Sequence, residues 1–418
     1  MRIAAIAGLF ALAGLAAGAA DAQTTPRAWV EITAAGPEAR AVTDAPACPA
    51  IVIDGKSAPM TQRAAPNDAF ANQVCAAAIP KTARRVSVSG TTLPLPKARP
   101  SRLVIIGDSG CRVVPGLIQN CNDPVAGWPF ARIAALAAAQ KPDLVVHVGD
   151  YYYREAPCPQ GMAACAGTPF GDKWLTWDTE VFAPAAPLLA AAPWVFARGN
   201  HEDCNRGGKG WFRLLDASPQ VRACPAQSDT FAVDLGGTRL FIVDSADPND
   251  AVVNPAQQAV FSGHLDEMAK FPGKGAVWIV THRPIWILAR NGATVTDGIG
   301  NATERAAVKG RDLSAIQLVL VGHVHNFSSL DFGVARPAEL IVGAGGDLQD
   351  PRDLPTPAIG PVSVDGLTAQ VYTKGGFGYF VFDRKGADWV GAFHDLTDKV
   401  VTTCRLHARS LTCAAPKP

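Results

Sequence analysis

The sequence predicts an α/β protein in which two β-sheets form a sandwich flanked by helices (αββα), preceded by a small all-β module. Short apolar runs rich in Val and Ile recur along the chain, and such runs are typical of strands buried on both faces. Segments with helical spacing alternate with these runs, which favours a layered architecture. Short β-favouring runs separated by Gly- and Pro-rich turns before residue 97 predict the module.

Length and charge set the first limits. The chain has 418 residues, enough for one large domain and a small one. It carries 38 Lys and Arg against 37 Asp and Glu, a formal net charge of +1. This balance gives no support for nucleic-acid or membrane-surface binding driven by bulk charge. An anionic substrate must therefore be attracted locally.

Residues 1–22 are typical of an export signal peptide. A basic start is followed by an apolar, Ala- and Gly-rich stretch, and Ala20-Asp21-Ala22 matches a cleavage site. A membrane-spanning helix is the alternative, disfavoured because no stop-transfer flank follows. We expect a mature protein that begins near Gln23, is periplasmic or secreted, and has no membrane span after signal removal.

Ten cysteines agree with export. Their number is even and none lies in a C-x-x-C pair, which disfavours a zinc ribbon. Connectivity does not follow from spacing, so pairing of nearest neighbours is a hypothesis. It gives the pairs Cys48–Cys75, Cys111–Cys121, Cys158–Cys165, Cys204–Cys224 and Cys404–Cys413.

Residues 23–97 are predicted to form the small β module. Short strands are expected at Ala28–Thr33, Ala50–Asp54 and Arg85–Ser89, with turns between them. The segment has little apolar mass, so one disulfide would staple it. A Pro-rich linker, residues 93–100, leads into the next domain.

Residues 98–418 are predicted to form the catalytic domain. Helices are expected at 128–140, 174–189 and 255–271, the last opened by Asn254 as N-cap and Pro255 at the first position. Gly236-Gly237 indicates a β-hairpin between two apolar runs. The remaining expected strands are 377–383, 389–394 and 399–406, antiparallel near the C-terminus.

Five polar fragments, each directly after an apolar run, carry the chemistry. Residues that follow such strands gather at the carboxyl edge of α/β sheets, where ligands bind. The fragments are Gly107-Asp108-Ser109-Gly110, Gly149-Asp150-Tyr151-Tyr152-Tyr153, Gly199-Asn200-His201-Glu202-Asp203, Thr281-His282-Arg283 and Gly322-His323-Val324-His325, after runs 102–106, 144–148, 194–198, 275–280 and 318–321.

The side chains in these fragments suit a pair of metal ions. They offer carboxylate, phenolate, amide and imidazole donors without a thiolate, which is too oxygen-rich for a structural zinc site. Four of the eight histidines lie in the fragments; His147, His264, His394 and His407 are expected to be structural. The candidate ligands are Asp108, Asp150, Tyr153, Asn200, His282, His323 and His325.

In order and spacing, these fragments resemble the calcineurin-like metallophosphoesterases over residues 101 to about 330. Most members have D-x-H in the first fragment, whereas this chain has Gly110 in place of that His and Tyr153 three residues after Asp150. Both features resemble the purple acid phosphatases. The resemblance therefore implies a binuclear centre with Fe(III) and a divalent Fe, Zn or Mn ion.

The resemblance also implies roles. Asp150 would bridge the ions, and carboxylate and phenolate suit the harder ferric ion. His201 would contact the phosphate or protonate the leaving group, with Glu202 or Asp203 orienting it, and Arg283 would add charge. Asp108, Tyr153 and His325 would complete the ferric site, and Asn200, His282 and His323 the divalent site.

The expected activity is hydrolysis of phosphorylated small molecules by a metal-bound hydroxide, with monoesters favoured over diesters. A phosphodiesterase or nucleotidase on the same site is the alternative within enzymes. A catalytically silent metal-binding or sensor protein is the alternative from another class, and a lost ligand would mark it. Every ligand position in this chain is occupied. An adhesive role for the N-terminal module is a third alternative.

Overall fold

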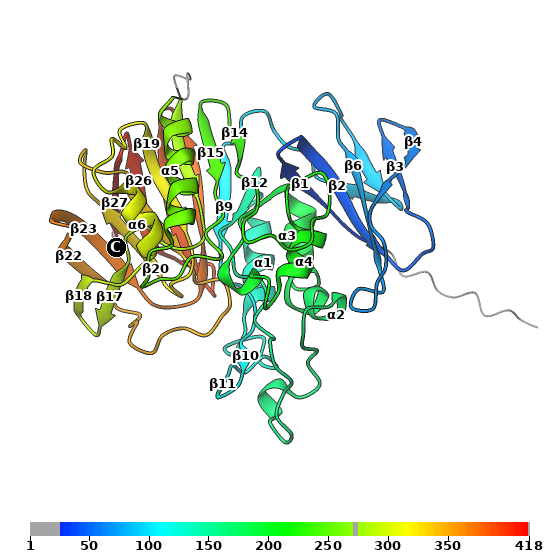
Figure 1. Ribbon diagram of the computed structural model, residues 1–418, viewed down its shortest axis with the longest axis horizontal. Coiled ribbons are helices and arrows are strands. Elements are labelled where there is room, and N and C mark those ends of the chain that lie inside the picture. Colours follow the sequence, from blue (N-terminus) through cyan, green and yellow to red (C-terminus); the bar gives the residue numbers. More distant parts are fainter. Residues whose placement is uncertain (1–25, 271–274, 417–418) are drawn as a thin grey trace, which may run out of the picture.

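The computed structural model describes residues 26–270 and 275–416 (Figure 1). The predicted export signal, residues 1–22, lies outside the described residues. Within the described ranges, no helix is long and apolar enough to cross a membrane. Two large sheets face each other and carry helices on their outer faces, as the sequence predicts (Figure 1).

Among the described residues, the first sheet has eleven strands. In its centre β9, β12 and β13 are parallel, and β24 pairs with β9 in the antiparallel direction. From edge to edge the order is β27 (Ser410–Ala414), β26 (Val400–His407), β25 (Asp388–Asp395), β24 (Gly378–Lys385), β9 (Arg102–Ile106), β12 (Leu144–His147), β13 (Trp194–Phe196), β1 (Arg27–Thr33), β2 (Gly36–Thr43), β6 (Gln73–Ala78) and β5 (Thr61–Ala64).

The second sheet has eight strands within the described residues. Its central strands β15, β16, β19 and β21 are parallel, so their carboxyl ends meet at one edge. The order is β14 (Phe231–Asp234), β15 (Thr238–Ile242), β16 (Ala276–Val280), β19 (Ile316–Val321), β21 (Ala338–Val342), β20 (Phe327–Asp331), β23 (Leu367–Lys374) and β22 (Ala358–Val364).

Alternation of side chains along the strands divides the core into layers. In β9, Leu103 and Ile105 pack between the sheets, whereas Val104 and Ile106 pack toward the helices. The helices α1 (Phe130–Ala139), α3 (Ala186–Ala191) and α4 (Gly208–Leu214) cover the first sheet, and α5 (Pro255–Ala269) and α6 (Ala302–Val308) cover the second. As predicted, the Asn254 side chain caps α5.

The N-terminal segment consists of strands, as expected, and four of them extend the first sheet. Strands β1, β2, β6 and β5 continue the first sheet, because β1 pairs in parallel with β13 at Glu31 and Trp194. The physical reason is a shared core, since Trp29 and Phe70 pack in the same apolar cluster as Trp194. A separate four-stranded sheet contains β4 (Lys56–Pro59), β3 (Ala50–Ile53), β7 (Val86–Val88) and β8 (Thr91–Leu93).

The helix predicted at 174–189 is broken in the structure. It divides into α2 (Trp174–Trp177), the π-helical turn η2 (Asp178–Phe182) and α3. Pro184 follows the π-helical turn, and a proline lacks the N–H that would continue the helix. The break leaves Glu180 buried beneath the loops that carry the metal-ligand candidates.

The predicted disulfide pairing is confirmed. All ten cysteines lie in the described residues and form nearest-neighbour pairs. Three of these disulfides follow the first three polar fragments. The Cys111–Cys121 loop contains β10 (Val113–Val114) and β11 (Leu117–Ile118), and η1 (Ala163–Cys165) lies in the Cys158–Cys165 loop. These two loops project below the sheets in Figure 1.

Candidate metal centre

The five polar fragments meet at the carboxyl edge of both sheets. Within the first sheet, the Asp108 N–H donates to the Gly149 carbonyl at 2.9 Å. Within the second, the Gly322 N–H donates to the His282 carbonyl at 3.0 Å. The Gly345 N–H, which follows β21, donates to Gly107 in the loop after β9 at 2.9 Å and ties the two sheets together. Backbone contacts therefore preset the distances between fragments.

The hydroxyl of Tyr153 lies at the centre of one ligand group. It is 2.9 Å from Oδ2 of Asp150 and 3.2 Å from Oδ1 of Asp108. Nε2 of His325 lies 3.3 Å from the same hydroxyl and 3.4 Å from Oδ1 of Asp108. The structure thus brings together the four side chains expected around the first ion.

The first fragment has Gly110 where the D-x-H pattern has a histidine, and this difference has a steric reason. A Cβ at this position would lie 2.7 Å from Cδ2 of Tyr153 and 2.5 Å from the Tyr151 carbonyl oxygen. The Tyr153 ring therefore occupies the space that a side chain at position 110 would need. Gly110 and Tyr153 are therefore linked, because the tyrosine ring fills the space that a side chain at position 110 would take.

A second ligand group shares Asp150 with the first. Nε2 of His282 lies 3.1 Å from Oδ2 of Asp150 and 3.1 Å from Oδ1 of Asn200. Nδ1 of His282 donates to the Val148 carbonyl at 2.9 Å, which leaves Nε2 as the free donor atom for a metal. The possible ligand atoms of Asp150, His282 and His323 lie within 4.8 Å of one another.

His323 has a carboxylate neighbour that sequence reasoning missed. Its Nε2 lies 3.2 Å from Oδ2 of Asp250 and 3.3 Å from Nη1 of Arg283, and Arg283 itself pairs with Asp250 at 2.5 Å. Burial opposes the shift, but His323 and Arg283 together hold the pKa of Asp250 well below its usual range. No sequence signal distinguishes Asp250 from its neighbours in the turn after β15.

His201 is oriented by Glu155 and not by Glu202 or Asp203. Its Nδ1 lies 2.5 Å from Oε1 of Glu155, while Nε2 lies 4.0 Å from Oδ2 of Asp150. The ring packs on Tyr153 with 3.9 Å between centroids. The expectation for Glu202 and Asp203 as orienting groups is thus corrected. Glu155 stands only two residues after Tyr153, which is the signal that could have found it.

Glu202 instead holds the backbone of two loops in place, those after β12 and β13. Its carboxylate accepts N–H groups from Tyr151 at 2.8 Å, Tyr152 at 3.0 Å and Gly199 at 3.0 Å. It therefore fastens the loop that bears Asp150. Burial is the main cause that raises the pKa of Glu202, to about 8. Asp203 pairs with Arg206 at 2.7 Å.

Three predicted ligands lie in the left-handed backbone region, which non-glycine residues rarely adopt. The φ angles are 55° at Asp108, 59° at Asp150 and 68° at His323. Such conformations cost free energy and persist where surrounding contacts hold them. Three of the nine described non-glycine residues with this backbone are thus candidate ligands, and the conformation helps to direct their side chains toward the same edge.

The carboxylates of Asp108 and Asp150 fit a bound cation. Both are at most 1 % exposed. In the described part of the chain, neither pairs with an arginine or a lysine, and their partners are a phenol, imidazoles and backbone N–H groups. Buried charges require compensation. Because oxygen and imidazole donors surround them, metal ions are the compensation that suits these groups.

The four histidines expected to be structural form hydrogen bonds with residues that are not candidate ligands. His147 is buried beneath the centre, where its Nε2 lies 2.9 Å from the Ser109 hydroxyl. His264, His394 and His407 contact Thr230, Asp398 and Asp388, respectively.

Comparisons with known proteins bear on this site. A family model described as calcineurin-like phosphoesterase matches residues 101–327. The structure of purple acid phosphatase PPD1 from yellow lupin seeds is similar, with a TM-score of 0.56, 13% identity, and coverage of 93% of this chain and 74% of that chain. The structure of PhoD is similar with a TM-score of 0.52, 10% identity, and coverage of 95% and 91%. At these identities the likeness concerns the fold. No curated protein matches the chain.

Proposed function

The chain belongs to the calcineurin-like phosphoesterase family, and from this premise we propose that it is an exported hydrolase of phosphate esters with a binuclear metal centre. The disulfides support export, because such bonds persist in oxidising compartments. The periplasm and the exterior both satisfy this condition.

The single observation that carries the proposal is the position of Asp150. Its Oδ2 lies 2.9 Å from the Tyr153 hydroxyl and 3.1 Å from Nε2 of His282. One carboxylate oxygen thus faces both ligand groups, as a bridge between two ions must. Asp108, Tyr153 and His325 would hold Fe(III), and Asn200, His282 and His323 would hold divalent Fe, Zn or Mn.

When bound, such a pair of ions supplies positive charge for phosphoryl oxygens and a nucleophile at neutral pH. The chain's own residues orient the ester and move protons. With Nδ1 of His201 directed to Glu155, Nε2 faces the centre, where it can deliver a proton to the leaving oxygen. Arg283, which pairs with Asp250 beside His323, is proposed to contact the phosphate through a remaining N–H.

The arrangement favours an enzyme over a silent sensor. Every candidate ligand reaches the same edge, and three are held in strained backbone. A lost ligand would mark a silent protein, and each of the seven candidate positions carries a donor side chain. Phosphodiesterase and nucleotidase activities use the same centre, so we expect the cavities beside it, one lined in part by Arg206 and Arg283 and one by His323 and His325, to decide among esters.

Metal analysis with a visible absorption spectrum tests the proposal. A ferric ion bound by Tyr153 gives a tyrosinate charge-transfer band, and Tyr153→Phe abolishes it. Tyr152→Phe is the matched control, because this neighbouring tyrosine is buried without a place among the ligands. A colourless, fully active protein that holds two zinc or manganese ions would contradict the ferric assignment alone.

Hydrolysis of an aryl phosphate tests the bridge. Asp150→Asn is expected to abolish hydrolysis and to reduce metal content, because one anionic oxygen facing both groups is lost. Retained hydrolysis in this variant would remove Asp150 from its proposed role.

A further inference from the structure

Arg112 lies beside the metal-ligand residues without being a candidate ligand itself. It follows β9 in the loop that the Cys111–Cys121 disulfide closes. Its backbone N–H donates to the side-chain oxygen of Gln119 at 3.0 Å, and the Gln119 N–H donates back to the Arg112 carbonyl at 2.8 Å. The backbone that carries this side chain is therefore held in place by its own loop.

The Arg112 guanidinium stacks on the ring of Tyr153. Its Cζ lies 4.7 Å from the ring centroid, within the range of an attractive contact between a cation and an aromatic face. The hydroxyl of the same ring lies among Asp108, Asp150 and His325. Because an arginine stays charged in proteins, the contact places a permanent positive charge next to this ligand group.

One edge of the guanidinium is committed to Asp347. Nε of Arg112 donates to Oδ2 of Asp347 at 3.1 Å, and Nη2 donates to the same oxygen. Asp347 is buried, and its N–H donates to the Asp108 carbonyl at 2.8 Å. Its Oδ2 also lies 3.3 Å from Nδ1 of His325. The carboxylate therefore fixes the guanidinium relative to two candidate ligands.

The other side of the guanidinium remains available. Nη1 of Arg112 forms no hydrogen bond with any of the described residues. A guanidinium presents its donors in a rigid planar fork, so pairing through Nε and Nη2 directs Nη1 away from Asp347. The side chain keeps 17% of its surface exposed, and it lines a cavity of about 510 Å³ together with His323 and His325. Its exposed part is thus in the wall of a cavity beside the ligands.

Arg283 occupies the corresponding place beside the other histidine of the last fragment. Its Nη1 lies 2.5 Å from Asp250 and 3.3 Å from Nε2 of His323. Its Nε donates to the Ser245 carbonyl at 3.1 Å, and Nη2 has no hydrogen-bond partner in the described part of the chain. Arg112 and Arg283 are thus each held by a carboxylate that contacts one histidine, and each keeps one terminal nitrogen free.

His323 and His325 belong to different ligand groups, so the two arginines flank the centre from different sides. Bound metal ions would supply most of the positive charge that attracts a phosphoryl group, whereas arginine N–H groups fix the direction of its oxygens. Resting on the proposed function, we infer that Arg112 binds a phosphoryl oxygen of the ester through Nη1 on the Tyr153 side, while Arg283 contacts the phosphate from the His323 side.

Calorimetry with inorganic phosphate on the metal-loaded, disulfide-bonded protein tests the inference. Arg112→Met keeps an unbranched stem but removes every donor, and is expected to weaken phosphate binding by about ten-fold or more per bound metal pair. KM for 4-nitrophenyl phosphate should rise by a similar factor. Unchanged phosphate binding would overturn the inference and leave the proposed function standing. A wild-type protein that neither binds phosphate nor hydrolyses the ester would contradict the proposed function instead.

Arg352→Met is the matched control. Arg352 lines the same cavity, but its side chain is 67% exposed and pairs with Asp350. Phosphate binding should change by less than about two-fold, because an exposed charge acts weakly through water. Equal losses in Arg112→Met and Arg352→Met would show that the arginines of this cavity act through charge alone, and would overturn the assignment to Arg112.

A double variant separates contact with phosphate from a structural part of Arg112. Arg112→Met leaves Asp347 buried without its cation, a change that is costly in itself. Asp347→Asn removes that charge, while Nδ1 of His325 keeps its bond to the Leu348 carbonyl at 2.6 Å. Phosphate binding is expected to stay weak in Arg112→Met/Asp347→Asn. Recovery of binding would show that Arg112 only compensates Asp347, and the inference would then be wrong.

Arg112→Lys tests the direction of the donors. An ammonium keeps the positive charge but has no second edge, so pairing with Asp347 leaves no rigid fork for phosphate. Phosphate binding should remain about five-fold or more weaker than in the wild type. Wild-type affinity in Arg112→Lys would mean that charge alone is sufficient, which contradicts a contact through Nη1.

Discussion

Nδ1 of His201 lies 2.5 Å from Oε1 of Glu155. The two residues come from different loops, since His201 follows β13 and Glu155 follows β12. The contact directs the other ring nitrogen of His201 toward Asp150, at 4.0 Å. A single carboxylate therefore determines which atom of the imidazole can exchange a proton with the substrate.

Replacement of this carboxylate is expected to slow turnover. Glu155→Gln keeps the volume but lets an amide face Nδ1, so kcat should fall by about 10–100-fold. Metal content, measured by elemental analysis, should stay that of the wild type, because Glu155 contacts none of the candidate ligands through its carboxylate in the described structure.

Asp203→Asn is the matched comparison. Asp203 lies two residues after His201, just as Glu155 lies two residues after Tyr153. Its carboxylate pairs with Arg206, however, and does not reach the His201 ring. Its kcat should change less than about three-fold. Equal losses in the two variants would show that the His201–Glu155 contact has no special part in turnover.

Gly110 and Gly263 should respond to alanine with opposite signs. A Cβ at Gly110 would lie 2.5 Å from the Tyr151 carbonyl oxygen, so Gly110→Ala should lower the free energy of unfolding by about 1–3 kcal/mol. Nothing lies within 4 Å of a Cβ at Gly263 in α5, and alanine favours a helix by about 1 kcal/mol over glycine. Chemical denaturation measures both. A tolerated Gly110→Ala would refute the steric exchange with Tyr153.

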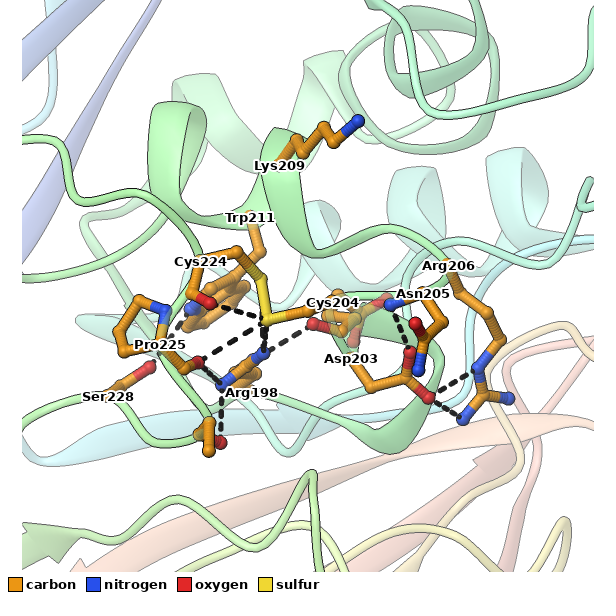
Figure 2. Close-up of a disulfide and its surroundings, with 12 residues drawn as sticks. Arg198, Asp203, Cys204, Asn205, Arg206, Lys209, Trp211, Cys224, Pro225 and Ser228 are labelled. Carbon is orange, nitrogen blue, oxygen red and sulfur yellow. Dashed lines mark hydrogen bonds and ion pairs between the residues drawn. A yellow bond between two sulfur atoms is a disulfide. The ribbon is translucent and has the colours of Figure 1, made fainter.

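The Cys204–Cys224 disulfide should affect both stability and activity. Replacement of both cysteines by serine is expected to cost about 3 kcal/mol of unfolding free energy. It should also lower kcat/KM, because Cys204, which follows Asn200 in the same loop, loses its covalent tie to Cys224 (Figure 2).

The Cys404–Cys413 disulfide provides the control. It joins β26 to β27 at the far edge of the first sheet. Its removal should lower the melting temperature with little change in kcat/KM. If both double variants lost activity to the same degree, general destabilisation would account for the loss.

Glu339 should make stability depend on pH. Burial raises the pKa of Glu339 from its ordinary value of 4.5 to about 8, although N–H groups from Ile285 and Trp286 oppose the shift. The folded protein then keeps a proton that the unfolded chain releases. Its stabilising contribution is full below pH 4.5 and is lost as the pH rises to about 8.

Glu339→Gln removes this proton equilibrium. The unfolding free energy of the wild type relative to the variant should fall by at least about 1 kcal/mol between about pH 5 and about pH 8.5. Glu267→Gln, at an exposed position of α5, should show no such trend. A constant difference between wild type and Glu339→Gln would mean that the carboxyl is ionised throughout this range.

Local sequence was sufficient to predict the strands and the candidate ligands that follow them. β9 is observed at the predicted residues, and the five runs become central strands of the two sheets. Val and Ile repeats are properties of a few neighbouring residues, so they can be read without tertiary contacts. The pairing of nearest-neighbour cysteines was a hypothesis that the structure confirms, and short loops of this kind close with little entropic cost.

Long-range contacts could not be predicted in this way. The union of β1 with β13 joins residues far apart in sequence through one parallel pairing, and neither strand contains a signal for the other. The helix expected over 174–189 ends before Pro184, but its sequence does not show that Glu180 lies beneath the loops, where it accepts N–H groups from Cys111 and Tyr153 at 2.8 and 2.9 Å.

By itself, the sequence determined which donors exist and their order along the chain. It also showed Gly110 in place of the D-x-H histidine together with Tyr153 three residues after Asp150. Only the tertiary structure decided that Glu155 orients His201 and that Asp250 joins His323. Glu155 reaches the ring because its N–H donates to Val113 at 3.1 Å, in the Cys111–Cys121 loop, which fixes the path of the chain after Tyr153. The direction of a side chain in a loop depends on backbone angles and on distant partners, and neither is encoded in spacing.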